Sequence, residues 1–399
     1  MTSVVWPAIT YETLPWERDL DQLELIPKSR RRKITSTYEA AIPAAIADQA
    51  IALPADLADR LAVVLTDLAR FDERQRARSY ALPALLLRSE SSSSSQIEHL
   101  TSSVRNVALA ELSGDAPHNA RLVAGNVAAM RTALSLEGDI TLEGIREVHR
   151  ELLTRSGGSY GGELREEQVW IGGTPYSPHG AEFVPPAWGR VADCLDDLTM
   201  FLRRDDLNPI VKAALAHAQF ETIHPFIDGN GRTGRTLLHI SLARDGVLEQ
   251  TTLPISAGLL HDVDAYMAAI RRYQQGDALP MVTCVARALE LAVSIGIMAA
   301  RHIDAVLDRW RGVITERAGA SIHRLPSVLV EQPVINAAYL ADTLNITPRA
   351  SRNVIERACG YGMLRKVGNA HRGVFYQADE IIDVLEDISG EQAIRRMRV

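Results

Sequence analysis

The run from His224 to Arg235 most constrains how this 399-residue chain can fold, because it places a polar, glycine-rich turn between two helical patterns. Before the run, Asn208 and Pro209 predict a helix start, and apolar residues then recur at spacings of three and four. After it, a second apolar helical pattern continues to about Gly246. The turn is therefore expected to join two core helices, with His224 at the end of the first.

The residue types in this turn suit phosphate binding. The glycines on either side of Asn230 allow positive φ angles that align backbone N–H groups around an anion, and the following helix adds the positive end of its dipole. Asp228 is a hard oxygen ligand for Mg²⁺, and Arg232 and Arg235 can bind phosphate oxygens. His224 can take up a proton near neutral pH. The alternative is a purely structural turn with a histidine at a helix end, which the joint arrangement disfavours.

The run resembles the complete signature of the Fic domain family, His-x-Phe-x-Asp/Glu-Gly-Asn-Gly-Arg-x-x-Arg. The resemblance implies an all-α Fic core with a small β-hairpin flap, which transfers AMP from ATP to a Ser, Thr or Tyr hydroxyl of a protein. It implies that His224 deprotonates this hydroxyl and that Asp228 holds Mg²⁺. The implied nucleotide site comprises Phe226, which anchors the loop, Gly229, Asn230 and Gly231 around the α- and β-phosphates, and Arg232, Gly234 and Arg235 towards the β- and γ-phosphates.

Other functions remain open within this resemblance. The intact Gly-Asn-Gly turn favours AMP transfer over protein phosphorylation, the activity of the Doc-like branch of the family. An intact His224 favours an enzyme over a DNA-binding regulator with a nucleotide-sensing core, because a sensor needs phosphate ligands but no base. Removal of AMP from a modified protein is a further alternative, because a glutamate near the site, of the kind described below, can position the water molecule for this reaction.

A β-rich segment precedes the signature. Residues 167–171 and 181–184 predict two short strands that are separated by glycines and prolines, and so a hairpin with a loose tip. In the Fic family such a flap holds the target segment as an added strand, so a target protein is expected to dock on residues 167–184. The preceding Gly162-Glu163-Leu164-Arg165 resembles the family's Gly-x-x-Arg sequence before the flap. A hairpin that only covers the core is the alternative.

Ser94 and Glu98 resemble a second family motif, Ser/Thr-x-x-x-Glu-Gly/Asn, which lies on an inhibitory helix. On a helix these two residues share a face, so Glu98 could pair with Arg235 and occupy the place of the ATP γ-phosphate. His99 departs from the motif, because Gly or Asn allows the positive-φ exit more readily. The helix therefore continues, or inhibition is weakened. The five serines at 91–95 also fit a flexible linker, against which the apolar residues on both sides argue.

The C-terminal residues resemble a winged helix-turn-helix domain. A helix that ends at Leu344 and a second that starts at Pro348 predict the helix-turn-helix. Strand-like runs at 363–367 and 373–376, around a turn at Gly368-Asn369, predict a two-stranded wing. Residues 349–372 hold six basic residues against one acidic residue in a chain of net charge −7, so duplex DNA is the favoured partner. Protein docking is the alternative, and a second copy of the chain is a further partner hypothesis.

Length and composition fit a multidomain intracellular protein. With 46% hydrophobic and 23% charged residues, the chain can form two or three cores. Neither a membrane span nor a signal peptide is expected, which favours a cytoplasmic location. The scattered Cys194, Cys284 and Cys359 predict neither disulfides nor a zinc site. The predicted units are an N-terminal helical region with the inhibitory motif (1–100), a Fic catalytic domain (101–300), a connecting helix (301–325) and a winged-helix domain (326–399).

Overall fold

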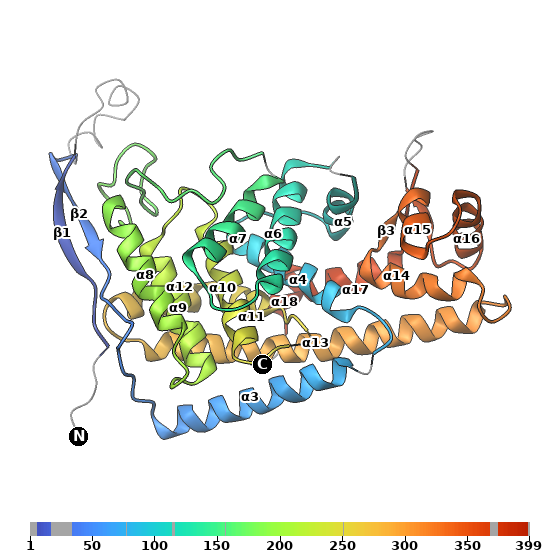
Figure 1. Ribbon diagram of the computed structural model, residues 1–399, viewed down its shortest axis with the longest axis horizontal. Coiled ribbons are helices and arrows are strands. Elements are labelled where there is room, and N and C mark those ends of the chain that lie inside the picture. The colour runs from blue at the N-terminus through green and yellow to red at the C-terminus, as the bar shows by residue number, and fades with distance from the viewer. Residues whose placement is uncertain are drawn as a thin grey trace.

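The computed structural model describes residues 6–16, 34–76, 78–113, 116–155, 157–249, 251–367 and 374–397. Most of these residues lie in helices (Figure 1). The helices up to the longest one are α3 (Ala55–Arg76), α4 (Leu82–Ile97), α5 (Val104–Ser113), α6 (His118–Ser135), α7 (Leu142–Thr154), η1 (Trp188–Arg190), α8 (Val191–Leu202), α9 (Pro209–Ile223), α10 (Asn230–Arg244), α11 (Ile255–His261), α12 (Val263–Gln274) and α13 (Leu279–Val313). The later helices are η2 (Ser321–Arg324), α14 (Leu325–Glu331), α15 (Ala337–Leu344), α16 (Pro348–Gly360), α17 (Asp379–Ser389) and α18 (Glu391–Arg395). The strands are β1 (Thr10–Pro15), β2 (Thr37–Ile42), β3 (Val334–Ile335), β4 (Arg365–Val367) and β5 (Phe375–Gln377).

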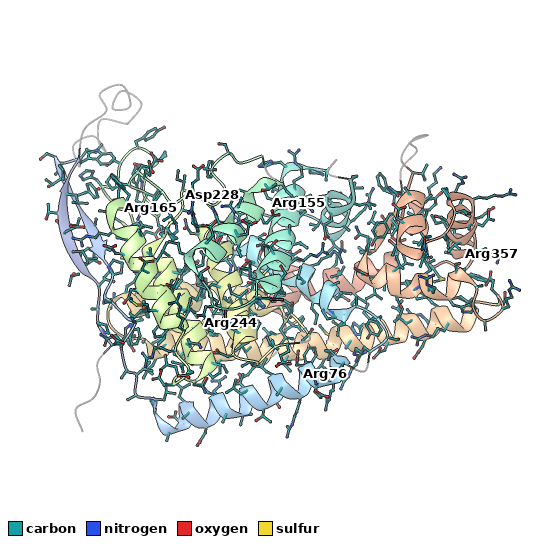
Figure 2. The ribbon with its side chains drawn as sticks, in the orientation of Figure 1. Arg76, Arg155, Arg165, Asp228, Arg244 and Arg357 are labelled. Carbon is teal, nitrogen blue, oxygen red and sulfur yellow. The ribbon has the colours of Figure 1, made fainter. Side chains whose placement is uncertain are left out.

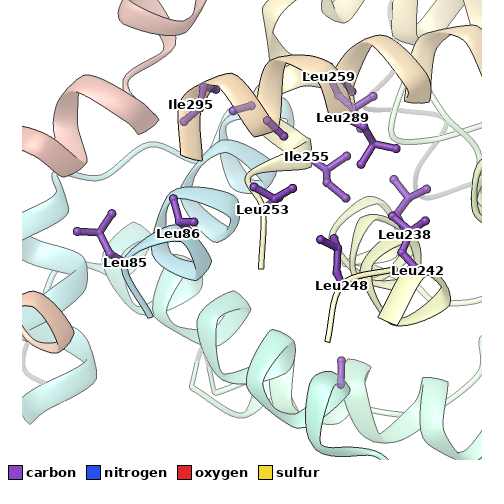
Figure 3. Packing of buried hydrophobic residues seen from close by; sticks show 14 of the residues in the cluster. Leu85, Leu86, Leu238, Leu242, Leu248, Leu253, Ile255, Leu259, Leu289 and Ile295 are labelled. Carbon is purple, nitrogen blue, oxygen red and sulfur yellow. The ribbon is translucent and has the colours of Figure 1, made fainter. Parts of the chain in front are cut away.

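The long helix α13 connects the two ends of the molecule. It runs from the end that carries β1 and β2 to the end that carries α15 and α16, and α3 packs along it (Figure 1). Leucine and isoleucine side chains of α4, α10, α11 and α13 meet in the core (Figure 3). Burial of each such side chain stabilises the fold by about 1.5–3 kcal/mol relative to exposure. The apolar core is continuous from the N-terminal helices to the elements from α14 to α18, which we call the C-terminal module.

By length and composition alone, α13 could also cross a membrane. However, 56% of the residues in its most apolar 18-residue window are buried inside the protein. Core helices of globular proteins meet the same criterion, and we therefore interpret α13 as a core helix.

The helices that border the signature begin and end close to where the sequence predicts. α9 begins at Pro209, and the Asn208 Oδ1 atom accepts a hydrogen bond from the Ile210 N–H at 3.0 Å. α10 ends at Arg244, near the predicted stop at Gly246. These boundaries are confirmed because capping and proline signals act locally and survive in the folded protein.

Two β segments differ from the sequence prediction. The N-terminal region, predicted as helical, contains the antiparallel strands β1 and β2 in addition to helices, and these strands were not predicted. The predicted flap strands at 167–171 and 181–184 do not form as regular strands. Their segment is an irregular hairpin with isolated antiparallel bridges between Ile171 and Phe183 and between Thr174 and Ser177. Glycines and prolines limit its ladder, and the Ala41 N–H of β2 donates instead to the Val184 carbonyl at 3.0 Å.

The serine run lies inside α4, where all residues from Ser89 to Ser95 are buried. The alternative of a flexible linker is therefore wrong. α4 packs against α6, α10 and α11 on the side of the signature and against α14 and α17 of the C-terminal module. Small serine side chains allow this close packing on several faces, although serine has a weak intrinsic helix preference.

The C-terminal module has the predicted order of local elements. α15 ends at Leu344 and α16 begins at Pro348, as expected. β4 and β5 pair antiparallel, and β5 also pairs with β3. The predicted turn at Gly368-Asn369, as well as Arg372 and Gly373, lies outside the described residues. α13 continues through the predicted boundary at residue 300, so the connecting helix is the end of a core helix. Cys194, Cys284 and Cys359 are free cysteines.

Candidate active site

The signature forms the connection between α9 and α10. His224 ends α9 in a left-handed conformation with φ of 50°, and its N–H donates to the Phe220 carbonyl at 2.9 Å. Gly229 then precedes α10 with φ of 79°, so the first N–H groups of α10 face the turn. Asp228, labelled in Figure 2, lies in this turn on the same side of the molecule as Arg165. The start of α10 therefore has the backbone geometry on which the predicted anion site depends.

Arg165 fastens the flap to the end of α9. Its Nε donates to the His224 carbonyl at 2.9 Å, and its Nη2 donates to the carbonyls of Ile223 at 3.4 Å and Pro186 at 2.6 Å. Its Nη1 donates to the Glu167 carbonyl at 3.1 Å. Burial lowers the pKa of Arg165 to about 10, and the guanidinium remains charged near neutral pH. The Arg165 side chain thus ties both ends of the flap to the backbone of His224.

A second buried residue, His149 of α7, fixes the turn itself. Its Nδ1 accepts a hydrogen bond from the Gly162 N–H at 2.9 Å, and its Nε2 donates to the Asp228 carbonyl at 2.9 Å. Its ring stacks on Phe226, with 3.7 Å between ring centroids. Phe226 is fully buried. The Asn230 amide group also braces the loop, because it exchanges two 2.8 Å hydrogen bonds with the Phe226 backbone. Any phosphate contact of Asn230 therefore falls to its backbone N–H.

The residues present fit a Mg²⁺ ion at Asp228. Its carboxylate is 57% exposed, and its Oδ2 atom lies 3.5 Å from Arg232 Nη2, a long distance for an ion pair. Within the described residues, no group of three His, Cys, Asp or Glu side chains could hold a metal. A single exposed carboxylate suits Mg²⁺, which takes its other ligands from water and phosphates.

His224 and Arg232 have unsatisfied polar atoms towards this site. Burial lowers the pKa of the His224 imidazole to about 4, and the Arg165 charge lowers it further, so the ring is neutral near neutral pH. Within the described part of the chain, His224 Nδ1 and the Nε and Nη1 atoms of Arg232 are buried without a hydrogen-bond partner. Unpaired buried donors are costly, and a bound anion would satisfy those of Arg232.

Glu98 lies at the start of α10 and pairs with Arg235. Its Oε1 accepts a hydrogen bond from Arg235 Nη2 at 2.8 Å, and Arg235 Nε donates to Ser94 Oγ at 2.9 Å. A Cβ atom at Gly231 would collide with the Glu98 carboxylate, which therefore lies directly on the start of α10. Burial raises the pKa of Glu98, but the charge and hydrogen bond of Arg235 outweigh it, so the pKa is lowered and the carboxylate is ionised.

His99 does not prevent this arrangement. α4 ends at Ile97, and His99 has a φ of 59°, the left-handed exit for which Gly or Asn is usual. The Leu100 N–H donates to the Ser95 carbonyl at 2.9 Å and closes the helix end. The alternative in which the helix continues past His99 is therefore wrong.

Behind Arg235 lies a buried polar pair that the sequence did not indicate as functional. His217 Nε2 lies 2.8 Å from the Tyr266 hydroxyl, and burial lowers the pKa of His217 to about 3. Both observations fit a structural role for His217 in the core. Burial raises the pKa of Glu221 to about 7, although the Arg235 charge opposes this effect. Glu221 Oε1 is buried and has no partner among the described residues.

Comparison with known proteins agrees with this geometry. Residues 139–242 match the model of the Fic/DOC family. This segment is therefore similar to Fic domains. The protein adenylyltransferase fic-1 of Caenorhabditis elegans is 34% identical over 184 residues, which cover 44% of this chain and 34% of that protein. The protein adenylyltransferase Fic of Drosophila melanogaster is 32% identical over 164 residues, 40% of this chain and 30% of that protein. The matched segments thus span about a third of the length of these relatives.

A solved structure shows the same fold over a larger part of the chain. The crystal structure of a Fic family protein from Desulfovibrio desulfuricans G20 matches with a TM-score of 0.54 and 19% sequence identity. The match covers 82% of this chain and 97% of that protein. The arrangement of helices around residues 139–242 therefore also occurs in another protein.

Proposed function

We propose that this chain is a protein adenylyltransferase, which transfers AMP from ATP to a Ser, Thr or Tyr hydroxyl of a target protein and is inhibited by its own Glu98. The observation that carries the proposal is the anion site at the start of α10, where Gly231 and the Arg235 guanidinium meet a carboxylate. The names of the relatives from Caenorhabditis elegans and Drosophila melanogaster, both adenylyltransferases, support it.

The neutral His224 imidazole supplies the base for this reaction. It takes the proton of the target hydroxyl while the hydroxyl oxygen forms a bond to the α-phosphorus of ATP. The bond between that phosphorus and the bridging oxygen of the β-phosphate breaks, and pyrophosphate leaves. The unpaired donors of Arg232 hold the leaving phosphates. A Mg²⁺ ion at Asp228 would neutralise phosphate charge.

Glu98 inhibits the reaction by competing for Arg235. With the carboxylate on this guanidinium, the γ-phosphate cannot bind there, and ATP cannot bring its α-phosphorus into line with the incoming hydroxyl. The carboxylate is 40% exposed, so it lies at the open side of the site, where a nucleotide enters.

The target segment is proposed to dock along the flap, residues 167–184. Arg165 supports this placement, because it holds the Glu167 and Pro186 carbonyls and the His224 carbonyl with one guanidinium. A segment added along the flap would therefore be in register with the base.

The position of the transferred label tests the reaction type. The Glu98→Gly variant is incubated with Mg²⁺ and ATP that is labelled in either the α- or the γ-phosphate, and its self-modification is followed by intact mass. AMP transfer keeps the α-label and adds one adenylyl group. Retention of the γ-label instead would assign phosphorylation, and no label from either substrate would favour the nucleotide sensor.

A second proposed activity is duplex DNA binding by α16. Arg349 and Arg352 are exposed on this helix and form no ion pair within the described chain, whereas Arg357 pairs with Glu316 and Arg365 is held by a carboxylate of α17. Two adjacent unpaired arginines on the second helix of a helix-turn-helix suit contact with phosphates. The full chain is mixed with a DNA duplex over a salt series. Binding should weaken steeply with salt and with Arg349→Ala plus Arg352→Ala. No binding at low salt would assign the module to protein docking.

A further inference from the structure

The helix α4 contacts two separate parts of the molecule through opposite faces. Ser94 and Glu98 face Arg235 in the nucleotide site. Ser89 and Gln96, which are seven residues apart and so share a stripe, lie on the roughly opposite side of the helix. This second stripe faces the C-terminal module.

The second stripe caps the end of α17. The last carbonyls of a helix have no partner within it and must be satisfied from outside. Ser89 Oγ donates to the Ile388 carbonyl at 3.0 Å, and Gln96 Nε2 donates to the Ser389 carbonyl at 2.8 Å. Both acceptors are at the carboxyl end of α17, which is itself packed on α4. Two side chains of the inhibitory helix therefore act as the C-cap of a helix more than 290 residues away in sequence.

Arg88 does the same for α14. Its guanidinium donates to the carbonyl of Glu331, the last residue of α14, and to Gln332 Oε1 at 3.2 Å. Its Nε also pairs with Glu111 of α5 at 2.6 Å, and both side chains are nearly buried. The positive charge lies at the negative end of the α14 dipole. Gln332 Nε2 in turn donates to the Ala108 carbonyl of α5 at 3.1 Å. The end of α14 is thus bound to both α4 and α5.

We propose that the C-terminal module is an intramolecular regulator that holds α4, and with it Glu98, in the inhibiting position. Because α17 and α14 both end on α4, the helix cannot move away from Arg235 without uncovering carbonyls of the module. Undocking of the module conversely removes three of the side-chain contacts that position α4. The inhibited site and the docked module thus stabilise each other, and the coupling acts in both directions. This inference rests on the proposed adenylyltransferase function.

The test removes the caps without touching the nucleotide site. Ser89→Ala and Gln96→Ala are combined in the full-length chain, and self-AMPylation with labelled ATP and Mg²⁺ is measured next to ATP affinity by calorimetry. Loss of two hydrogen bonds should raise AMP transfer on the order of tenfold and tighten ATP binding. In a Glu98→Gly background the same pair should change neither quantity, because no inhibitory carboxylate remains to be held.

Two further variants keep the result interpretable. Arg357→Gln removes an exposed ion pair at the far end of the module and should leave AMP transfer unchanged. Gln96→Met keeps the shape of a partly exposed side chain and should give a smaller activation if the double variant fails to fold.

Equal effects in both backgrounds, or no activation in the wild-type background, would overturn the proposal. If Glu98→Gly itself transfers no AMP, the proposed function fails. The ATP affinities still decide the inference in that case, because only a regulator that acts through Glu98 tightens binding in one background and not in the other.

Discussion

The His224 imidazole can act as a base because its surroundings keep it neutral. His224→Ala should lower AMP transfer at least roughly 100-fold, the usual range for loss of a general base. ATP and Mg²⁺ affinity should change little, since Asp228, Arg232 and Arg235 remain. Both quantities are measured in a Glu98→Gly background, where transfer is high enough to quantify. Retention of most transfer would show that another group takes the proton.

His149 holds the backbone of the turn at Asp228 and ties it to Gly162. His149→Phe keeps an aromatic ring against Phe226 but leaves the Gly162 N–H and the Asp228 carbonyl without their partner. Each unpaired buried group costs about 1–3 kcal/mol. The variant should therefore melt at a lower temperature and need more Mg²⁺ for half-maximal transfer. An unchanged Mg²⁺ requirement, with only the melting temperature lowered, would limit His149 to a structural role.

At the residue scale, the sequence predicts a site residue when the residues it acts with lie close to it in the sequence. His224, Asp228 and Arg235 lie within one run, and the structure brings them together as expected. The roles of His149 and Arg165 depend on carbonyls that lie far away in sequence. The sequence signal for His149 is only its place on the apolar face of α7.

At the scale of elements, the exit from α4 carries backbone strain. His99 has a positive φ, which costs an L-residue about 1–2 kcal/mol relative to glycine. His99→Gly should therefore raise the melting temperature and strengthen inhibition, because it stabilises the conformation in which Glu98 contacts Arg235. Thermal melting and basal AMP transfer measure the two effects. A lower melting temperature together with higher transfer would mean that the His99 side chain itself holds α4 in place.

Helices were easier to predict than strands for a physical reason. α9 has an asparagine cap, a proline at its first turn and an apolar pattern, all of which are local. β1 has mostly exposed or half-exposed residues, so it has no buried face from which a strand could be recognised. α4 is stable as a helix mainly because neighbouring helices surround it, and its serines gave no indication of this burial.

At the scale of the whole molecule, buried neutral histidines should make stability depend on pH. Burial lowers the pKa of His149 and of His224 from 6.5 to about 4 and that of His217 to about 3. The unfolded chain therefore binds more protons than the folded one below about pH 6.5, and stability falls as pH falls towards 4. The pKa of Glu221 is raised to about 7, so this residue makes the protein more stable as pH falls from 7 to 4.5. It is one group against three histidines, and the histidines decide the net effect.

The melting temperature should accordingly drop by several degrees between pH 6.5 and 4.5. His217→Phe is informative because this ring lies behind Arg235 and outside the turn, and the variant should show a shallower pH dependence. A melting temperature that stays constant over this range would contradict neutral burial of these rings.

The continuous core also shows why domain boundaries could not be predicted from the sequence. α13 packs on α9 beside the signature and on α14 and α17 of the C-terminal module, and α4 likewise packs on α10 and on this module. Sequence patterns report the length and polarity of each helix but not which helices share its faces. The contact between α4 and the C-terminal module therefore becomes visible only in the structure.

The rate of AMP transfer by Glu98→Gly tests the central claim most directly. Removal of the carboxylate frees Arg235 for the γ-phosphate, so self-AMPylation should rise by at least about tenfold over the wild type. Glu98→Gln, which keeps the shape but loses the charge, should give an intermediate rate. Equal rates for the wild type and Glu98→Gly would contradict the account, because the carboxylate at the start of α10 would then not restrain catalysis.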